Sequence, residues 1–193
     1  MKKFSRTEVI SLLIIFSILI VVSVPNFVIS LRRARDQIRR DDMGLVQKAL
    51  GEYYSDFKAF PTGSPDGRIM NCLRAGDKPV QGKDGMWKVD PIPCDWGKDP
   101  LKNLFSDKIY MPILPIDPDY QKGVTFLYLS DGNRYQLFAA MEGMEEAEID
   151  PKIIARNLKC GSRVCNIGRS YDAPIEMSIE EYNKLLLNAH EKK

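Results

Sequence analysis

The chain has 193 residues, with 28 Lys and Arg against 26 Asp and Glu, so its formal net charge is +2. A hydrophobic share of 44% is enough to build a core and, with the balanced charge, excludes an intrinsically disordered chain. The weak global charge also makes nucleic acid an unlikely partner. We expect one globular domain preceded by an apolar segment.

The first element is an apolar run from Val9 to Val28, which contains no charged residue. At about 1.5 Å rise per residue, a helix of this length crosses a hydrocarbon core of roughly 30 Å. A secretory signal peptide is the alternative, but its apolar core has only about 7–15 residues and ends at a small-residue cleavage site. We predict a retained anchor: residues 1–30 form a short leader and a transmembrane helix, and residues 31–193 form the globular domain.

The orientation of this anchor is predicted from its flanks and from the cysteines. Basic residues follow the run in greater number than they precede it, so the positive-inside rule alone would place the domain in the cytoplasm. The four cysteines all lie after the run, an even number that is typical of disulfides formed outside the cytoplasm. We therefore predict a single-pass inner-membrane protein with an extracytoplasmic domain. The basic residues after the run are Arg32, Arg33, Arg35, Arg39 and Arg40.

From Leu31 to Phe57 the pattern predicts an amphipathic helix, because apolar residues recur at spacings of four, three and four. We expect it to continue the membrane helix through Pro25 as one helix of about 50 residues that ends near Ala59. The charged residues between the apolar ones, the arginines included, are predicted to form a solvated face. Contact of the arginines with DNA or anionic headgroups is the alternative. The apolar stripe consists of Val46, Leu50, Tyr53 and Phe57, and Asp36, Asp41 and Asp42 belong to the charged face.

The remaining elements are shorter. Residues 62–118 are rich in glycine, proline and charge, which indicates loops with short strands. The β-rich segments 124–129 and 135–141 flank an Asp-Gly turn and predict a hairpin. Ser178 and Glu181 form the pattern of a capping box and predict a C-terminal helix. The fold class is therefore α+β, a long helix packed on a small antiparallel sheet.

The four cysteines allow three pairings. Proximity favours Cys72 with Cys94 and Cys160 with Cys165. A zinc site is the alternative, but only the second pair has the tight spacing that zinc sites use. We predict two disulfides and no metal.

A family resemblance appears at the N-terminus in the spacing of Phe4, Glu8 and Pro25. Glu8 follows Phe4 by four residues, and Pro25 follows Glu8 by seventeen. This resembles the start of mature type IV pilins and type II secretion pseudopilins. The segment 49–62 also looks like the end of the pseudopilin helix, and the predicted hairpin is similar to their closing strands.

The resemblance implies a subunit of a type IV pilus or type II secretion pseudopilus-like fibre, at the cell surface or in the periplasm. In that family apolar helices form the fibre core, and the glutamate pairs with the N-terminal amine of another subunit. The implied partners are other pilin or pseudopilin subunits, the membrane and a prepilin peptidase, which would cleave before Phe4 and leave an amine that can be methylated. Lys3 stands where the family has glycine, and Arg6, which could pair locally with Glu8, is also unusual.

Other chemistry finds little support in the sequence. Asp117, Asp119 and Asp131 invite a calcium hypothesis by analogy with the major pseudopilins, but aspartates beside proline and glycine are ordinary turn formers. The single histidine, His190, is near the end of the chain, and no hydrolase or phosphate-binding motif is present. We expect no cofactor and no enzymatic activity. A monomeric membrane-tethered extracytoplasmic binding domain is the main alternative function, and a tethered hydrolase is a distant one.

Overall fold

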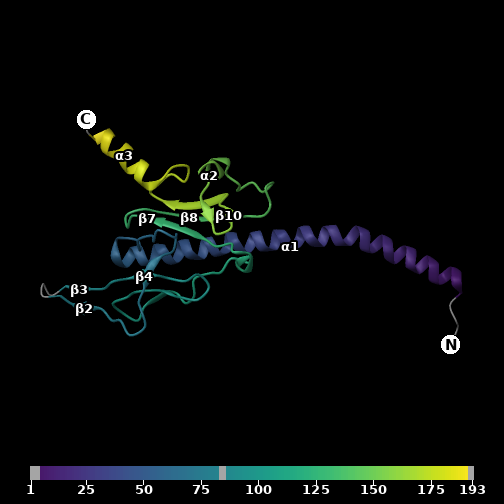
Figure 1. Ribbon diagram of the computed structural model, residues 1–193, viewed down its shortest axis with the longest axis horizontal. Helices are drawn as coiled ribbons and strands as arrows, with labels where there is room; N and C mark the ends of the chain where they lie inside the picture. Colours follow the sequence, from purple (N-terminus) through teal and green to yellow (C-terminus); the bar gives the residue numbers. More distant parts are fainter. Residues whose placement is uncertain (1–4, 83–85, 191–193) are drawn as a thin grey trace.

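The computed structural model describes residues 5–82 and 86–190 and has an α+β fold. It is built around helix α1 (Arg6–Phe57), which is 52 residues long and is not interrupted at Pro25. Figure 1 shows the first half of α1 standing free of the rest of the chain, with the domain gathered around the second half. The prediction of one continuous helix is confirmed.

The end of α1 follows from its last residues. Lys58 takes the left-handed conformation, with φ of 55°, and its backbone N–H donates to the Tyr54 carbonyl. Such a residue caps the helix and turns the chain away from its axis. Pro61 follows shortly after, and its lack of a backbone N–H disfavours any continuation of the helix there. The predicted end near Ala59 is thus two residues late.

The largest sheet is antiparallel and has the strand order β11-β8-β7. Its hairpin is the predicted one, and the central strand β8 is buried along its whole length. In the connecting turn the Asp131 carboxylate accepts the N–H groups of Asn133 and Arg134, and Gly132 takes a φ of 92°. The sequence did not predict the third strand. The strands are β7 (Leu127–Ser130), β8 (Tyr135–Ala139) and β11 (Ile167–Tyr171).

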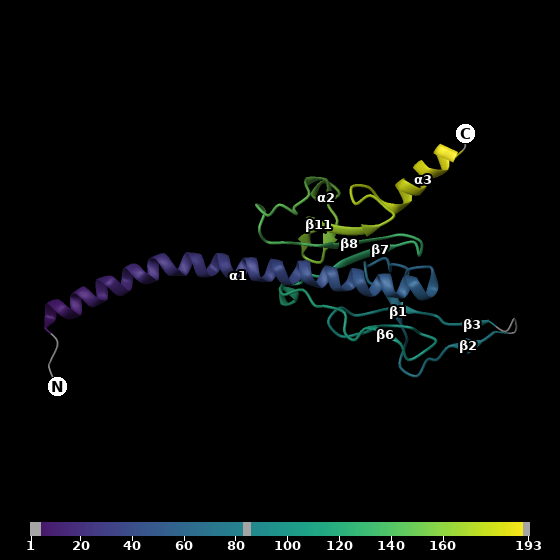
Figure 2. The same ribbon diagram turned by 180° about the vertical axis from the view of Figure 1, so that it is seen from behind.

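Residues 60–118 form only small two-stranded pieces, as the glycine and proline content indicated. Figures 1 and 2 both place these pieces on one side of α1 and the β7–β8–β11 sheet on the other, so the second half of α1 runs through the domain. The antiparallel pairs are β1 with β4, β2 with β3, and β5 with β6. Their bounds are β1 (Met70–Cys72), β2 (Val80–Gln81), β3 (Trp87–Lys88), β4 (Ile92–Pro93), β5 (Leu101–Lys102) and β6 (Ile109–Met111).

The chain after the hairpin adds small elements and a terminal helix. Ser178 and Glu181 exchange the hydrogen bonds of a capping box, which confirms the predicted start of α3. Figure 1 shows α3 pointing away from the domain. These elements are α2 (Pro151–Ala155), β9 (Lys159–Cys160), β10 (Arg163–Val164) and α3 (Ile179–His190), while the short 3-10 helix η1 (Tyr120–Lys122) lies before the hairpin.

The main hydrophobic core lies between α1 and the strands on both sides of it. Val46 and Leu50, two members of the predicted stripe, are 1% and 0% exposed, while Tyr53 and Phe57 are half-buried at its edge. Tyr128 is also fully buried, and its hydroxyl donates to the Pro61 carbonyl. The domain is therefore assembled around the buried residues of the second half of α1.

Candidate assembly helix and its junction with the domain

The head of α1 is closed by a capping box between Ser5 and Glu8. The Ser5 backbone N–H donates to Glu8 Oε2 at 2.7 Å, and the Glu8 N–H donates to Ser5 Oγ at 3.3 Å. The S-x-x-E pattern that predicted α3 is present here too, and sequence reasoning overlooked it. Within residues 5–82 the Glu8 carboxylate binds Ser5 and forms no ion pair with Arg6. Phe4, the first residue of the predicted pattern, lies outside the described residues.

The first half of α1 exposes an apolar surface on all sides. Every residue from Ser5 to Leu31 is exposed, and the helix is long and apolar enough to be a candidate membrane span. Three of its polar side chains bond to the helix itself: Ser17, Asn26 and Ser30 each donate to the carbonyl four residues earlier, at 2.8, 3.0 and 2.9 Å. Contact between such a large apolar surface and water is unfavourable, so the surface is expected to be covered by lipid or by other apolar helices.

Beyond this surface, a buried arginine joins α1 to the domain. The Arg39 side chain is 0% exposed, and its five N–H donors make five hydrogen bonds. Nε and Nη2 bind the two carboxylate oxygens of Asp117 at 2.8 and 2.9 Å, the bidentate geometry that makes such pairs strong. The other three bonds go to Asp36, Asp119 and Glu142.

The acids around Arg39 are themselves fully bonded. Asp36, also 0% exposed, accepts the backbone N–H groups of Glu142 and Gly143, both at 2.9 Å. Asp119 accepts from Lys122 at 2.8 Å and is paired with Arg163 at 3.0 Å. Because every carboxylate has cationic or N–H partners, the cluster can stay charged without water.

The protonation states follow from these contacts. Burial by itself disfavours the charge on Arg39, but the hydrogen bonds to Asp117, Asp36 and Glu142 outweigh it and raise the pKa of the guanidinium. Burial would raise the pKa of Asp119, yet bonds from Lys122 and Arg39 hold it well below the ordinary carboxyl value. Arg39 and Asp119 therefore both stay charged at neutral pH.

The other arginines after the apolar run bind one acidic segment, residues 142–148, which we call the acidic strap. Arg35 Nε and Nη2 bind the Glu142 carboxylate at 2.6 and 2.7 Å, and Arg32 pairs with Glu145. Arg40 lies 3.8 Å from Glu146 and 3.4 Å from Glu148. The strap thus holds the domain to α1 directly beyond the candidate span.

This arrangement corrects the predicted solvated face. Asp36 and Arg39 were assigned to it, but both are completely buried. Extending the apolar stripe from Val46 backwards by alternating steps of three and four reaches Met43, Arg39 and Asp36, so the helical period contained the signal. A charged residue in the register of an apolar stripe was taken for an exposed one, because charges are rarely buried unless paired.

The aspartates of the calcium hypothesis have other partners. Asp117 and Asp119 are bound by Arg39, and Asp131 is bound by backbone N–H groups in the hairpin turn and by Asn183 at 3.0 Å. The three are therefore not brought together as a ligand set. Among the described residues, the structure contains no group of three or more acidic, histidine or cysteine side chains placed to hold a metal ion.

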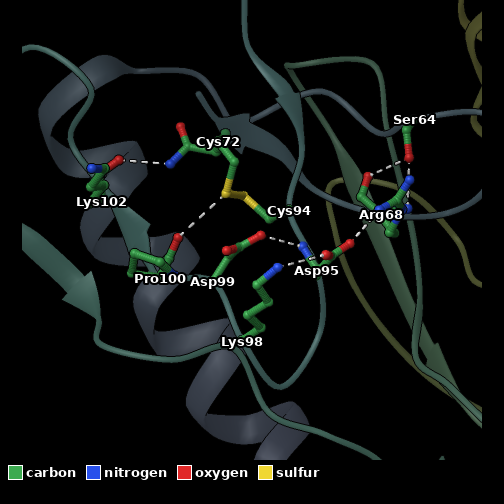
Figure 3. Close-up of a disulfide and its surroundings, with 10 residues drawn as sticks. Ser64, Arg68, Cys72, Cys94, Asp95, Lys98, Asp99, Pro100 and Lys102 are labelled. Carbon is green, nitrogen blue, oxygen red and sulfur yellow. Dashed lines mark hydrogen bonds and ion pairs between the residues drawn. A yellow bond between two sulfur atoms is a disulfide. The ribbon is translucent and has the colours of Figure 1, made fainter. Parts of the chain in front are cut away.

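The structure contains two disulfides, and their pairing is the one that proximity favours: Cys72–Cys94 and Cys160–Cys165. Figure 3 shows the first bridge beside Asp95 and Asp99, where the Asp95 N–H donates to the Asp99 carboxylate at 2.7 Å. The bridge joins the last residue of β1 to the residue that follows β4, in a region with little regular structure. It replaces the stabilisation that a larger sheet would provide.

The described residues thus combine an uncovered apolar helix with a domain that is rigidly attached to it. This arrangement can bind lipid or other apolar helices and can hold the domain at a fixed angle to them. No family model, curated protein or solved structure matches the chain. The support for a function comes from this surface and from the residue pattern at its head.

Proposed function

We propose that the chain is a structural, non-enzymatic subunit of a fibre of the type IV pilus or type II secretion pseudopilus kind, assembled through the first half of α1. The observation that carries the proposal is the complete exposure of residues 5–31 in a helix that continues without a break into the domain. In the membrane, lipid covers this surface. In a fibre, the same surface on other copies covers it, so the subunit can exist in both places.

The rigid junction favours a fibre over a simple tether. A tethered binding domain needs only a span and a linker, and a flexible linker serves that role well. Here Arg39 and the acidic strap fix the domain on α1 through buried and half-buried ion pairs. A fixed angle between helix and domain is what identical subunits need to stack in a regular helical array.

The two disulfides support an extracytoplasmic location for the domain. Cys94, Cys160 and Cys165 are 0% exposed, so both bridges belong to the folded core. Such bridges form and persist in oxidising compartments. The proposal therefore places the anchor in the cell inner membrane and the domain outside the cytoplasm. The partners are other pilin-like subunits and, before assembly, a prepilin peptidase acting before Phe4.

The test uses the double role of Glu8, which caps its own helix and, in the proposal, binds the N-terminal amine of another copy. Glu8→Gln keeps a capping side chain at this position but removes the charge. Ser5→Ala removes the cap but keeps the charge, and Glu8→Leu removes both. Each variant is expressed as the full chain in cells that assemble the fibre, and subunit incorporation is measured in sheared fibre fractions against the amount in membranes.

We expect Glu8→Gln and Glu8→Leu to lose incorporation, while Ser5→Ala keeps most of it and all three retain both disulfides. This outcome would assign the effect to the charge rather than to the first turn of the helix. Incorporation of Glu8→Gln at the level of the unmodified chain would contradict the role of Glu8. If the unmodified chain is found only in membranes and never in a fibre fraction, the result would instead support the tethered binding domain.

A further inference from the structure

Three large apolar side chains on the domain half of α1 are exposed at intervals of seven residues. Leu31, Ile38 and Leu45 are 44%, 47% and 54% exposed. Residues seven apart on an α-helix differ by only about 20° in direction, so the three form one line, which we call the lateral stripe. The stripe begins where the fully exposed apolar surface of residues 5–31 ends.

The domain of the same chain does not cover the lateral stripe. Ile38 directly precedes Arg39, and Leu45 directly precedes Val46, and these following residues are 0% and 1% exposed. Successive helical residues point about 100° apart, so the stripe lies along one edge of the face that meets the domain, and Ala49, four residues after Leu45, already belongs to that face at 3% exposed. The ion pairs of Arg39 fix the rotation of α1, so the stripe cannot turn inward.

The position of the stripe relative to the membrane determines how much free energy is gained when a partner covers it. Within lipid, apolar helices gain no hydrophobic free energy from packing together, because lipid tails are as apolar as leucine. The stripe lies beyond the apolar run, beside Arg32 and Arg40 and their acidic partners, where the medium is water. Covering it there is favoured by the hydrophobic effect.

A second α1 is the partner that fits this surface. Spacing by seven is the pattern by which two helices lie side by side over several turns. The exposed Ala34 lies near the same line and is small enough to let a second helix approach closely. Two copies anchored in one membrane hold their α1 helices parallel, so the stripe of each is presented at the same height.

We propose that the lateral stripe pairs two copies of this chain through their α1 helices while both are still anchored in the membrane. This inference rests on the proposed function for the placement of the anchor, and it adds an association step that precedes fibre growth. The stripe aligns the copies outside the lipid, and the apolar helices below it then lie next to each other.

The test is site-specific photo-crosslinking in native membranes that contain the full chain and no assembled fibre. A photoreactive phenylalanine derivative replaces Ile38 in one variant and Leu45 in another. The matched control carries it at Gly51, which is exposed, has open space around its Cα and points about 120° away from Leu45. All native cysteines in the described residues are in disulfides, so reducing and non-reducing gels report the adduct and the fold separately.

We expect a crosslinked dimer at positions 38 and 45, mapped to α1 of the second copy, in about tenfold or greater excess over position 51. With the photoreactive residue at 38, Leu45→Glu should reduce the adduct by a similar factor, because a charge in the line disfavours burial. No adduct, an equal adduct at 51, or capture of a different protein would overturn the inference.

Failure of the proposed function would look different. If fibres form but no stripe adduct appears, the pairing step alone is wrong and the fibre subunit stands. If the adduct appears in membranes but no fibre ever contains the chain, the pairing stands and the fibre proposal is wrong.

Discussion

Arg39 shows how a single buried cation can organise a joint between a helix and a domain. Its carboxylate partners come from its own helix, from the loop before η1 and from the acidic strap. Each partner is well bonded, so the cluster is stable as a whole although every member would be costly to bury alone. The same side chain therefore fixes both the angle and the rotation of α1.

Replacing Arg39 with alanine should destabilise the protein by about 3–5 kcal/mol, because it leaves buried carboxylates without their cation. Arg33→Ala is the matched control, since Arg33 is 65% exposed and lies 4.0 Å from Glu146. Its loss should be at most about 1 kcal/mol. Denaturant unfolding of the detergent-solubilised full chain measures both. Equal losses in the two variants would show that the buried cluster contributes no more than a surface pair.

Asp42 should make stability depend on pH in the opposite sense from the other acids. Burial, and then the charges of Asp41 and Asp117, raise its pKa to about 6. The folded protein therefore binds this proton more tightly than the unfolded chain, and stability falls as the pH rises from about 4 to about 6. Asp42→Asn should remove this loss and stabilise the protein at pH 7 by on the order of 1 kcal/mol, after allowance for partial exposure.

The pH series includes Asp107→Asn, at an exposed loop position, as a control for the effect of an Asp→Asn change itself. Below about pH 4 the Asp42 variant and the unmodified chain should converge, because Asp42 is then protonated in both states. Asp119 and Glu142 have lowered pKa values, so their contribution is lost as the pH falls further. Identical profiles for Asp42→Asn and the unmodified chain would refute the assignment.

At the scale of elements, the disulfides stand in for regular structure. The pieces β1 to β6 are two or three residues long, too short to be stable as isolated pairs. Cys72–Cys94 closes the loop that contains β2 and β3, and Cys160–Cys165 closes the short turn between β9 and β10. The larger bridge restricts the unfolded chain in a region of very short strands, whereas the smaller one lies where backbone hydrogen bonds, such as that from the Cys165 N–H to the Leu158 carbonyl, also hold the chain.

Removing the larger bridge with Cys72→Ser and Cys94→Ser should cost about 3 kcal/mol on the chain-entropy model. The matched double variant Cys160→Ser and Cys165→Ser removes a bridge that closes a much shorter loop. Its free energy of unfolding should fall by about 2 kcal/mol. Denaturant midpoints give the two losses, and limited proteolysis should cut residues 73–93 first in the former variant. A larger loss from the shorter loop would mean that packing around the bridge, rather than loop entropy, dominates.

The whole molecule is strongly asymmetric. One half of α1 carries a complete domain with its own core, and no other part of residues 5–82 and 86–190 covers the other half. Figure 2 shows this from behind: the N-terminal half of α1 extends well beyond the domain. The two halves therefore depend on different surroundings, and they should be separable.

Deleting residues 1–30 should yield a folded, water-soluble domain with both disulfides, because the buried face of α1 lies at Asp36 and beyond. The full chain should remain in the membrane fraction until detergent is added. Membrane flotation, circular dichroism and thiol counting check the three expectations. A deletion variant that still floats with membranes would place the anchoring surface on the domain rather than on the apolar helix.

The sequence by itself determined the features that depend on neighbours along the chain. The continuous helix through Pro25, its end to within two residues, the hairpin at Gly132 and the cap at Ser178 follow from local spacing and turn chemistry. The favoured cysteine pairing belongs with them, because the shortest loops are the easiest to close. Strand β7 begins at Leu127 rather than Val124 because Val124 instead bridges Gly161, a contact that no local pattern encodes.

The tertiary structure alone decided which charges are buried and what they bind. Arg39 meets acids 78, 80 and 103 residues away, and nothing in its neighbourhood distinguishes it from the exposed Arg33 except its register with the apolar stripe. Ion pairs between distant segments depend on how the strap and the loop before η1 fold back onto α1. The sequence therefore predicts the helix, and only the folded domain determines which of its faces is joined to the domain and which is left for a partner.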